Sequence, residues 1–205
     1  MEDQILETYH REKRRIGDFL TSRKTLLGDR DQIFFELMFC ISVPQSKAPV
    51  CRSCLEGLMK SGELKASNKQ ELAVLLKGIR FQNNKSKFIV LARNDFDIIY
   101  GKIQELKQKP KELRVWILRN VKGIGMKEAS HLLRNLGFGE DFAILDVHIL
   151  RTMKELGLID SIKLTKKRYF EYEIVFQNYA RQLGLKPAEL DIAIWLMKSG
   201  NHEMM

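Results

Sequence analysis

The sequence is poor in cysteine and proline and has no long apolar segment, and each shortage excludes a class of protein. Its 205 residues include three cysteines and four prolines. Three cysteines cannot all pair with one another, so a disulfide-rich secreted scaffold is excluded. A membrane-spanning helix needs a run of about 18 apolar residues, and none is present. The N-terminus lacks a basic start followed by an apolar core, so we expect a cytoplasmic protein with no membrane partner.

Two of the cysteines, Cys51 and Cys54, have the spacing of a metal-binding pair, but the other half of such a site is missing. A structural zinc site needs four ligands, usually from two such pairs. No cysteine follows Cys54, and the histidines form no matching pair. We therefore predict buried free thiols on a helix.

Basic residues outnumber acidic ones along the chain. Lysine and arginine total 35 and aspartate and glutamate total 26, which gives a net charge of +9. Such a surplus favours a polyanionic partner, most often nucleic acid, although a merely soluble basic surface is the alternative. With 44% hydrophobic residues, the chain is long enough to bury the core of one domain or of two small ones.

Apolar residues recur at spacings of three and four almost everywhere, and no long β-alternation is present. Asn68 and Pro187 favour helix starts, whereas Gly137 and Gly184 favour helix ends. The pattern predicts an all-α protein. Its helices are expected near Gln4–Leu20, Asp31–Ile41, Lys47–Lys60, Lys69–Lys77, Asn84–Arg93, Asp97–Lys107, Lys111–Asn120, Lys127–Leu136, Val147–Leu156, Lys166–Leu183 and Pro187–Lys198.

A glycine turn separates two of these helices. In Gly123-Ile124-Gly125, two residues without a Cβ flank an apolar one, so the backbone can approach a phosphate closely. The helix that follows aims its N–H groups and its positive dipole end at that phosphate. The pattern predicts a helix–hairpin–helix that holds the DNA backbone without reading sequence, and an ordinary helix end with a loop is the alternative.

Two residues near this turn are candidates for covalent chemistry. Lys127 opens the second hairpin helix, and a lysine whose amine has lost its proton is a nucleophile. The alternative for Lys127 is a plain phosphate contact. Asp146 follows three apolar residues and precedes another helix, where Asp commonly serves only as an N-cap. An acid in an apolar setting can also stabilise a developing cation, so the pair together indicates chemistry on a sugar.

The segment Val121–Ala129, followed by Leu145-Asp146-Val147-His148, resembles the helix–hairpin–helix DNA glycosylase superfamily. Within it, the compact size and the run Leu190–Trp195 resemble the type 2 8-oxoguanine DNA glycosylase/AP lyases of archaea and bacteria. The resemblance covers about residues 30–200. It implies a helical barrel near residues 30–140 and a second lobe from 1–29 with 141–205, separated by a DNA-binding cleft.

The resemblance also implies a mechanism that needs no metal and no cofactor. The damaged nucleotide flips out of the duplex, and Lys127 attacks the sugar C1′ and displaces the base. β-Elimination from the Schiff base then nicks the strand, while Asp146 stabilises the cationic sugar and helps the amine to lose its proton. The hairpin carbonyls of Arg119, Val121 and Ile124 match positions that hold a cation in relatives, as a structural aid only.

Four residues are candidates for the base pocket or for the wedge that fills the gap left by a flipped base. By the same similarity, Gln45 is a candidate wedge, and an ordinary turn is its alternative. Phe81 and Trp195 are candidates for the walls that stack on the base, with core packing as the alternative for each. Asp191, one turn before Trp195, is a candidate acceptor for a base N–H.

The sequence departs from the family pattern at three places. Lys122 stands where many members have proline, which the turn should tolerate. The iron–sulfur cysteines of endonuclease III-like members are absent. The sequence ends in Met205, where type 2 proteins often have a lysine whose region helps to recognise oxidised guanine.

The sequence therefore predicts a monomeric base excision repair enzyme that acts on double-stranded DNA containing 8-oxoguanine or abasic sites and associates with the nucleoid when bound. One alternative is a glycosylase/AP lyase for oxidised pyrimidines. Another is a non-catalytic helix–hairpin–helix module in which Lys127 only contacts phosphate. A protein-interaction helical domain is disfavoured by the charge and the hairpin together.

Overall fold

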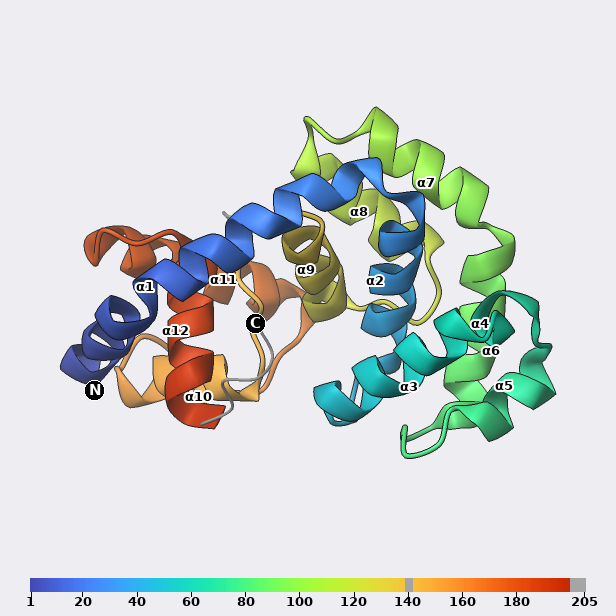
Figure 1. Ribbon diagram of the computed structural model, residues 1–205. Helices are drawn as coiled ribbons and strands as arrows, with labels where there is room; N and C mark the ends of the chain where they lie inside the picture. The colour runs from blue at the N-terminus through green and yellow to red at the C-terminus, as the bar shows by residue number, and fades with distance from the viewer. Residues whose placement is uncertain (139–141, 200–205) are drawn as a thin grey trace. The chain divides into compact units, whose positions relative to one another are not determined.

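The structure is a computed structural model that describes residues 1–138 and 142–199 (Figure 1), and all of its regular elements in these ranges are helical. They are α1 (Glu2–Lys24), η1 (Thr25–Gly28), α2 (Arg30–Ser42), α3 (Ala48–Lys60), α4 (Glu63–Ala66), α5 (Lys69–Leu75), α6 (Gln82–Asn94), α7 (Phe96–Glu105), α8 (Pro110–Asn120), α9 (Met126–Asn135), α10 (Val147–Glu155), α11 (Lys166–Gln182) and α12 (Pro187–Ser199).

The all-α class and each helix predicted from the sequence are confirmed, with ends that move by a few residues. Asn68 caps α5 through a capping box with Glu71, as its position indicated. Gly137 and Gly184 follow α9 and α11 with positive φ angles, which glycine adopts without strain. The elements missed by the sequence are η1 and α4, which are single turns and too short to show a helical repeat.

The chain divides into two compact units, and each is described by itself. The central unit is Leu26–Leu132, and the terminal unit joins Met1–Thr25 to Leu133–Met205. The division falls inside α9, whereas the sequence placed its boundaries near residues 30 and 140. The cleft and the barrel expected from the family resemblance stay predictions.

Helix α2 is the core of the central unit. Asp29 caps its N-terminus by accepting hydrogen bonds from the N–H groups of Asp31 and Gln32. From Ile33 to Ser42 the helix is buried on all sides, because α3, α6 and α7 pack around it. This helix ends at Ser42, immediately before the loop that carries Gln45.

Helix α12 has the same role in the terminal unit, where α1, α10 and α11 pack against it. Two tyrosines hold the long α1 helix in place. The Tyr179 hydroxyl donates to Glu2 Oε2 at 2.9 Å, and the Tyr9 hydroxyl donates to Glu189 Oε1 at 3.5 Å. Among the described residues, no helix is both long and apolar enough to span a membrane.

Candidate DNA-binding and catalytic site

The glycine turn has the geometry of a tight helical hairpin between α8 and α9. Gly123 has a φ of +86°, and a Cβ built there would lie 2.6 Å from the ring of Phe88 on α6. Any side chain at Gly123 would therefore strain the backbone and collide with Phe88. The hairpin interior is buried, as expected, by the apolar set Val121, Ile124, Ala129, Leu132 and Leu133.

Helix α9 starts directly after the turn. Gly125 is exposed, and its carbonyl accepts from the N–H of Ala129 at 2.9 Å, which closes the first helical turn. The N–H groups of a first turn have no acceptor within their own helix, so they are available to a phosphate. The exposed Gly125 and the helix that follows therefore have the arrangement expected of a phosphate-binding turn, and phosphate binding there stays a prediction.

Lys127 lies in the first turn of α9, directly after the glycine turn. Its side chain is 30% exposed, and Nζ lies 3.8 Å from Glu128 Oε1. A contact of that length leaves the amine able to reach another group. The position agrees with both sequence interpretations, a phosphate contact and a nucleophile.

Asp146 is the N-cap of α10. Its Oδ1 accepts from the N–H groups of His148 at 2.8 Å and Ile149 at 2.9 Å. The preceding residues 142–145 are buried, and Asp146 itself is half-buried. Both cap bonds use Oδ1, so the cap fixes the carboxylate while Oδ2 makes neither bond. Lys127 belongs to the central unit and Asp146 to the terminal unit, so their joint action stays a prediction.

Gln45 and Phe81 share a rare backbone conformation. Among the described residues they are the two non-glycine residues with positive φ, at 57° and 60°. This conformation is costly for a residue with a side chain and is often kept at functional positions. Phe81 is 51% exposed and Gln45 is also exposed, so Phe81 is not a core residue.

The other two pocket candidates lie on α12 in the terminal unit. Asp191 is 3% exposed, and its Oδ2 accepts from Arg134 Nη1 at 2.8 Å. Trp195 lies one turn later on the same helix and is half-buried. Sequence reasoning missed Arg134, because a bond between residues 57 positions apart leaves no local pattern.

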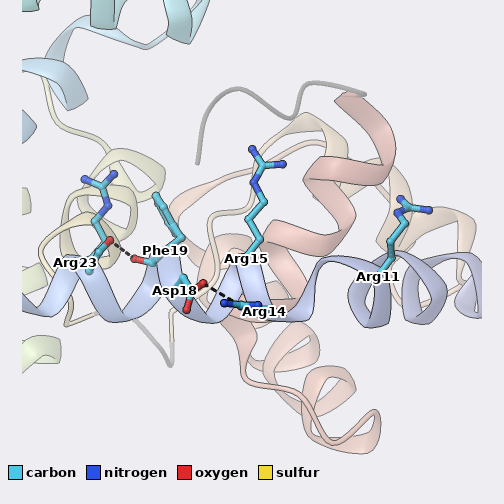
Figure 2. Close-up of a pocket in the computed structure, with 7 residues that line it drawn as sticks. Arg11, Arg14, Arg15, Asp18, Phe19 and Arg23 are labelled. Atoms are coloured by element: carbon cyan, nitrogen blue, oxygen red, sulfur yellow. Dashed lines mark hydrogen bonds and ion pairs between the residues drawn. The ribbon is translucent and has the colours of Figure 1, made fainter.

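Helix α1 carries a basic surface that sequence reasoning also missed. Figure 2 shows Arg11, Arg15 and Arg23 extending to one side of the helix. Together with Phe19 they line a hollow of about 520 Å³. Arg11 and Arg15 are four residues apart, which places them on one face of a helix. This spacing is the sequence pattern from which the basic surface could have been predicted. The surface agrees with the polyanionic partner inferred from the net charge.

The cysteines do not form a metal site in the described part of the chain. Cys51 and Cys54 are free thiols, Cys51 buried and Cys54 partly buried, and Cys40 is buried as well. Burial raises the pKa of both Cys51 and Cys54, which keeps them protonated. Within residues 1–138 and 142–199, no group of three His, Cys, Asp or Glu side chains is arranged to hold a metal. Met205 lies outside the described residues.

Comparison with known proteins places this architecture in one family. The model of the 8-oxoguanine DNA glycosylase family matches residues 12–185. An 8-oxoguanine DNA glycosylase/AP lyase of Fusobacterium nucleatum is 39% identical over 179 residues, which covers 84% of this chain and 82% of the relative.

Two solved structures have the same fold over nearly the whole chain. The 8-oxoguanine DNA glycosylase of Thermotoga maritima superposes with a TM-score of 0.86 at 32% identity and covers 98% of both chains. The Methanocaldococcus jannaschii 8-oxoguanine glycosylase/lyase, in complex with a 15mer DNA containing 8-oxoguanine, gives a TM-score of 0.85 at 33% identity and covers 97% of both chains. The hairpin, the lysine that follows it and these relatives together show that the chain belongs to the 8-oxoguanine DNA glycosylase family of helix–hairpin–helix proteins.

Proposed function

We propose that this protein excises 8-oxoguanine from double-stranded DNA and then nicks the strand at the resulting abasic site. The observation that carries the proposal is the hairpin turn at Gly123, with Lys127 in the first turn of the helix that follows. The turn supplies backbone N–H groups for a phosphate, and the lysine supplies an amine beside that phosphate. The relatives, named 8-oxoguanine DNA glycosylase/AP lyase, indicate the same substrate and both reactions.

The chemistry assigned to Lys127 proceeds through a covalent sugar adduct. The neutral amine attacks C1′, the bond between C1′ and the base breaks, and the base leaves with the bonding electrons and takes up a proton. The C1′–O4′ bond then opens to give a protonated imine. Loss of a C2′ proton expels the 3′ phosphate by β-elimination, and water finally hydrolyses the imine and frees the lysine.

Asp146 is assigned an electrostatic and proton-accepting role. The α10 cap orients its carboxylate through Oδ1, which leaves Oδ2 for the sugar or the amine. A fixed carboxylate stabilises positive charge on the sugar as the base departs, without reorganising during the reaction.

The remaining site residues divide by task. Gly123, Ile124 and Gly125 hold the DNA backbone. Gln45 fills the space left by the flipped nucleotide. Phe81 and Trp195 stack on bases, and Asp191 accepts a base N–H while its Oδ2 stays bonded to Arg134. In this assignment residues 30–140 hold the backbone and supply the amine, the wedge and Phe81. Residues 1–29 with 141–205 supply the acid and the C-terminal base-pocket helix. One chain supplies every group, so we propose that a monomer acts.

A panel of duplexes, each with one defined lesion, tests the substrate. We expect faster base release from 8-oxoguanine than from oxidised pyrimidines, and strand nicking at a preformed abasic site. Preferential release of oxidised pyrimidines would keep the chemistry and overturn the substrate. Binding without release of any base would favour the non-catalytic module.

A further inference from the structure

Lys85 is a buried lysine whose ammonium group is bonded to the loop that carries Gln45. It lies in the first turn of α6 and is 5% exposed. Its Nζ donates to the carbonyl of Ser42 at 2.5 Å, to the carbonyl of Pro44 at 2.7 Å and to the hydroxyl of Ser46 at 2.9 Å. An ammonium has three N–H donors, so each of them has an acceptor.

One of these acceptors, the Ser42 carbonyl, belongs to the end of α2, where the backbone needs donors, and the other two lie in the loop that follows. Carbonyl groups in the last turn of a helix have no donor within that helix, and Pro44 has no N–H of its own to offer. A positive charge is also favourable at the C-terminal end of the helix dipole. Lys85 therefore caps the C-terminal end of α2. It also fixes the backbone at Pro44 and the side chain of Ser46, the residues immediately before and after Gln45.

The same lysine is joined to Phe81 by a second set of bonds. The N–H of Lys85 donates to the carbonyl of Phe81 at 3.0 Å, and the N–H of Arg80 donates to the Ser46 hydroxyl at 3.0 Å. The hydroxyl of Ser46 thus accepts from both Lys85 and Arg80. Through these bonds the loop of Gln45 and the loop of Phe81 form one hydrogen-bonded unit.

This unit contains both strained positions of the described chain. Gln45 and Phe81 have positive φ angles, and both side chains are exposed. A non-glycine residue keeps this conformation only where its surroundings hold it. Pro44, Ser46 and Arg80 are the immediate neighbours of the two strained residues, and each takes part in these hydrogen bonds. The Lys85 side chain makes the bonds to Pro44 and Ser46.

Helix α6 also touches the hairpin. Phe88, one turn after Lys85, contacts Gly123 closely. Burial lowers the pKa of Lys85, so the fold keeps this ammonium in its interior at a cost. The three hydrogen bonds from Nζ offset this cost of burial when their acceptors are held in place. The same arrangement of acceptors holds the loops of Gln45 and Phe81.

We propose that Lys85 is a positioning residue that holds Gln45 and Phe81 in the conformation needed to extrude the damaged base. The inference rests on the proposed function, because it takes Gln45 as the wedge and Phe81 as a stacking side chain. Lys85 itself touches neither DNA nor the reacting atoms in this role. It acts on the step before chemistry, whereas Lys127 acts on the sugar.

Base release from an 8-oxoguanine duplex and nicking of a preformed abasic-site duplex are compared for wild type, Lys85→Met and Ser46→Ala. An abasic site has no base to extrude, so it bypasses the step assigned to Lys85. We expect Lys85→Met to slow base release by about tenfold or more and abasic nicking by less than about threefold. Ser46→Ala keeps the lysine but removes the acceptor shared with Arg80, and a smaller loss in the same direction is expected. The matched control is Lys87→Met, an exposed lysine on the same helix.

A double-mutant cycle separates positioning from a general loss of structure. If Lys85 acts through Gln45 and Phe81, Lys85→Met adds less than about a twofold loss to a protein that already carries Gln45→Ala and Phe81→Ala. A full loss in that background, or equal losses on both duplexes, overturns the proposal. If thermal melting shows Lys85→Met unfolded, Ser46→Ala decides alone, and unchanged base release in it overturns the proposal. No base release by wild type would instead reject the proposed function.

Discussion

Arg134 and Asp191 form an ion pair inside the terminal unit, with Nη1 and Oδ2 2.8 Å apart. The guanidinium of Arg134 also lies over the ring of Phe19, with its central carbon 5.9 Å from the ring centroid. The pair connects α9 to α12, and Phe19 adds α1 to the same cluster. The candidate base acceptor is therefore held by a partner that orients it.

Replacing Arg134 by Met should destabilise the protein strongly. The substitution removes a counter-charge from a buried carboxylate, which costs about 3–5 kcal/mol when one partner of a buried pair is lost. Urea unfolding of Arg134→Met measures this cost. Adding Asp191→Asn should recover part of the loss, because the buried charge is removed as well. A double variant as unstable as the sum of the singles would show that the two residues do not interact.

Replacing Gly123 by Ala should damage the hairpin. The φ of +86° and the contact with Phe88 both disfavour a side chain, so we expect a loss of about 1–3 kcal/mol. DNA binding should weaken equally on damaged and undamaged duplexes, because we propose that the turn contacts the DNA backbone and not the base. Gly57→Ala is the matched control, since Gly57 lies in α3 with nothing within 4 Å of the added Cβ. Equal stability of the two variants would contradict the account of the turn.

Asp146 has a capping role and a proposed chemical role, and one substitution separates them. Asparagine caps helices as well as aspartate, so Asp146→Asn should change stability by less than about 0.5 kcal/mol. It removes the negative charge, and we expect base release to fall by about a hundredfold or more. Single-turnover kinetics and thermal melting of the same preparation give both values. Asp146→Ala, the comparison, should lose activity and also about 1 kcal/mol of stability. Full activity of Asp146→Asn would leave Asp146 as a cap alone.

The raised pKa of Tyr179 predicts that the folded protein loses stability in alkaline solution. Burial and the hydrogen bond to Glu2 raise the pKa of Tyr179 far above its ordinary range. The folded protein therefore holds this proton more tightly than the unfolded chain does. The resulting stability is present below about pH 10, the ordinary tyrosine pKa, and is lost as the pH rises above it.

Urea unfolding of wild type and Tyr179→Phe, measured between about pH 8 and about pH 11.5, tests this effect. The variant should be less stable at the lower end and lose less stability across the series. Glu2→Gln should flatten the curve partly, because it removes the charge but leaves a hydrogen-bond acceptor. Parallel curves for wild type and Tyr179→Phe would contradict the assignment.

The sequence predicted those features that depend on local chemistry. The Asn68 cap and the Gly123 turn were readable because each uses residues close together in the chain. Lys85 and Arg134 were not, since their partners lie 39 to 57 residues away and produce no spacing pattern. The left-handed conformation of Phe81 was equally hidden, because no residue preference favours a phenylalanine there.

Borohydride trapping tests the central claim most directly, because it reduces a Schiff base to a permanent cross-link. Wild type, Lys127→Gln and the control Lys122→Gln, an exposed lysine of the same turn, are each incubated with an 8-oxoguanine duplex and borohydride. The account predicts an adduct in wild type and in the control, none in Lys127→Gln, and a modified peptide that contains Lys127. An adduct that persists in Lys127→Gln, or release of 8-oxoguanine by wild type without any adduct, would contradict it.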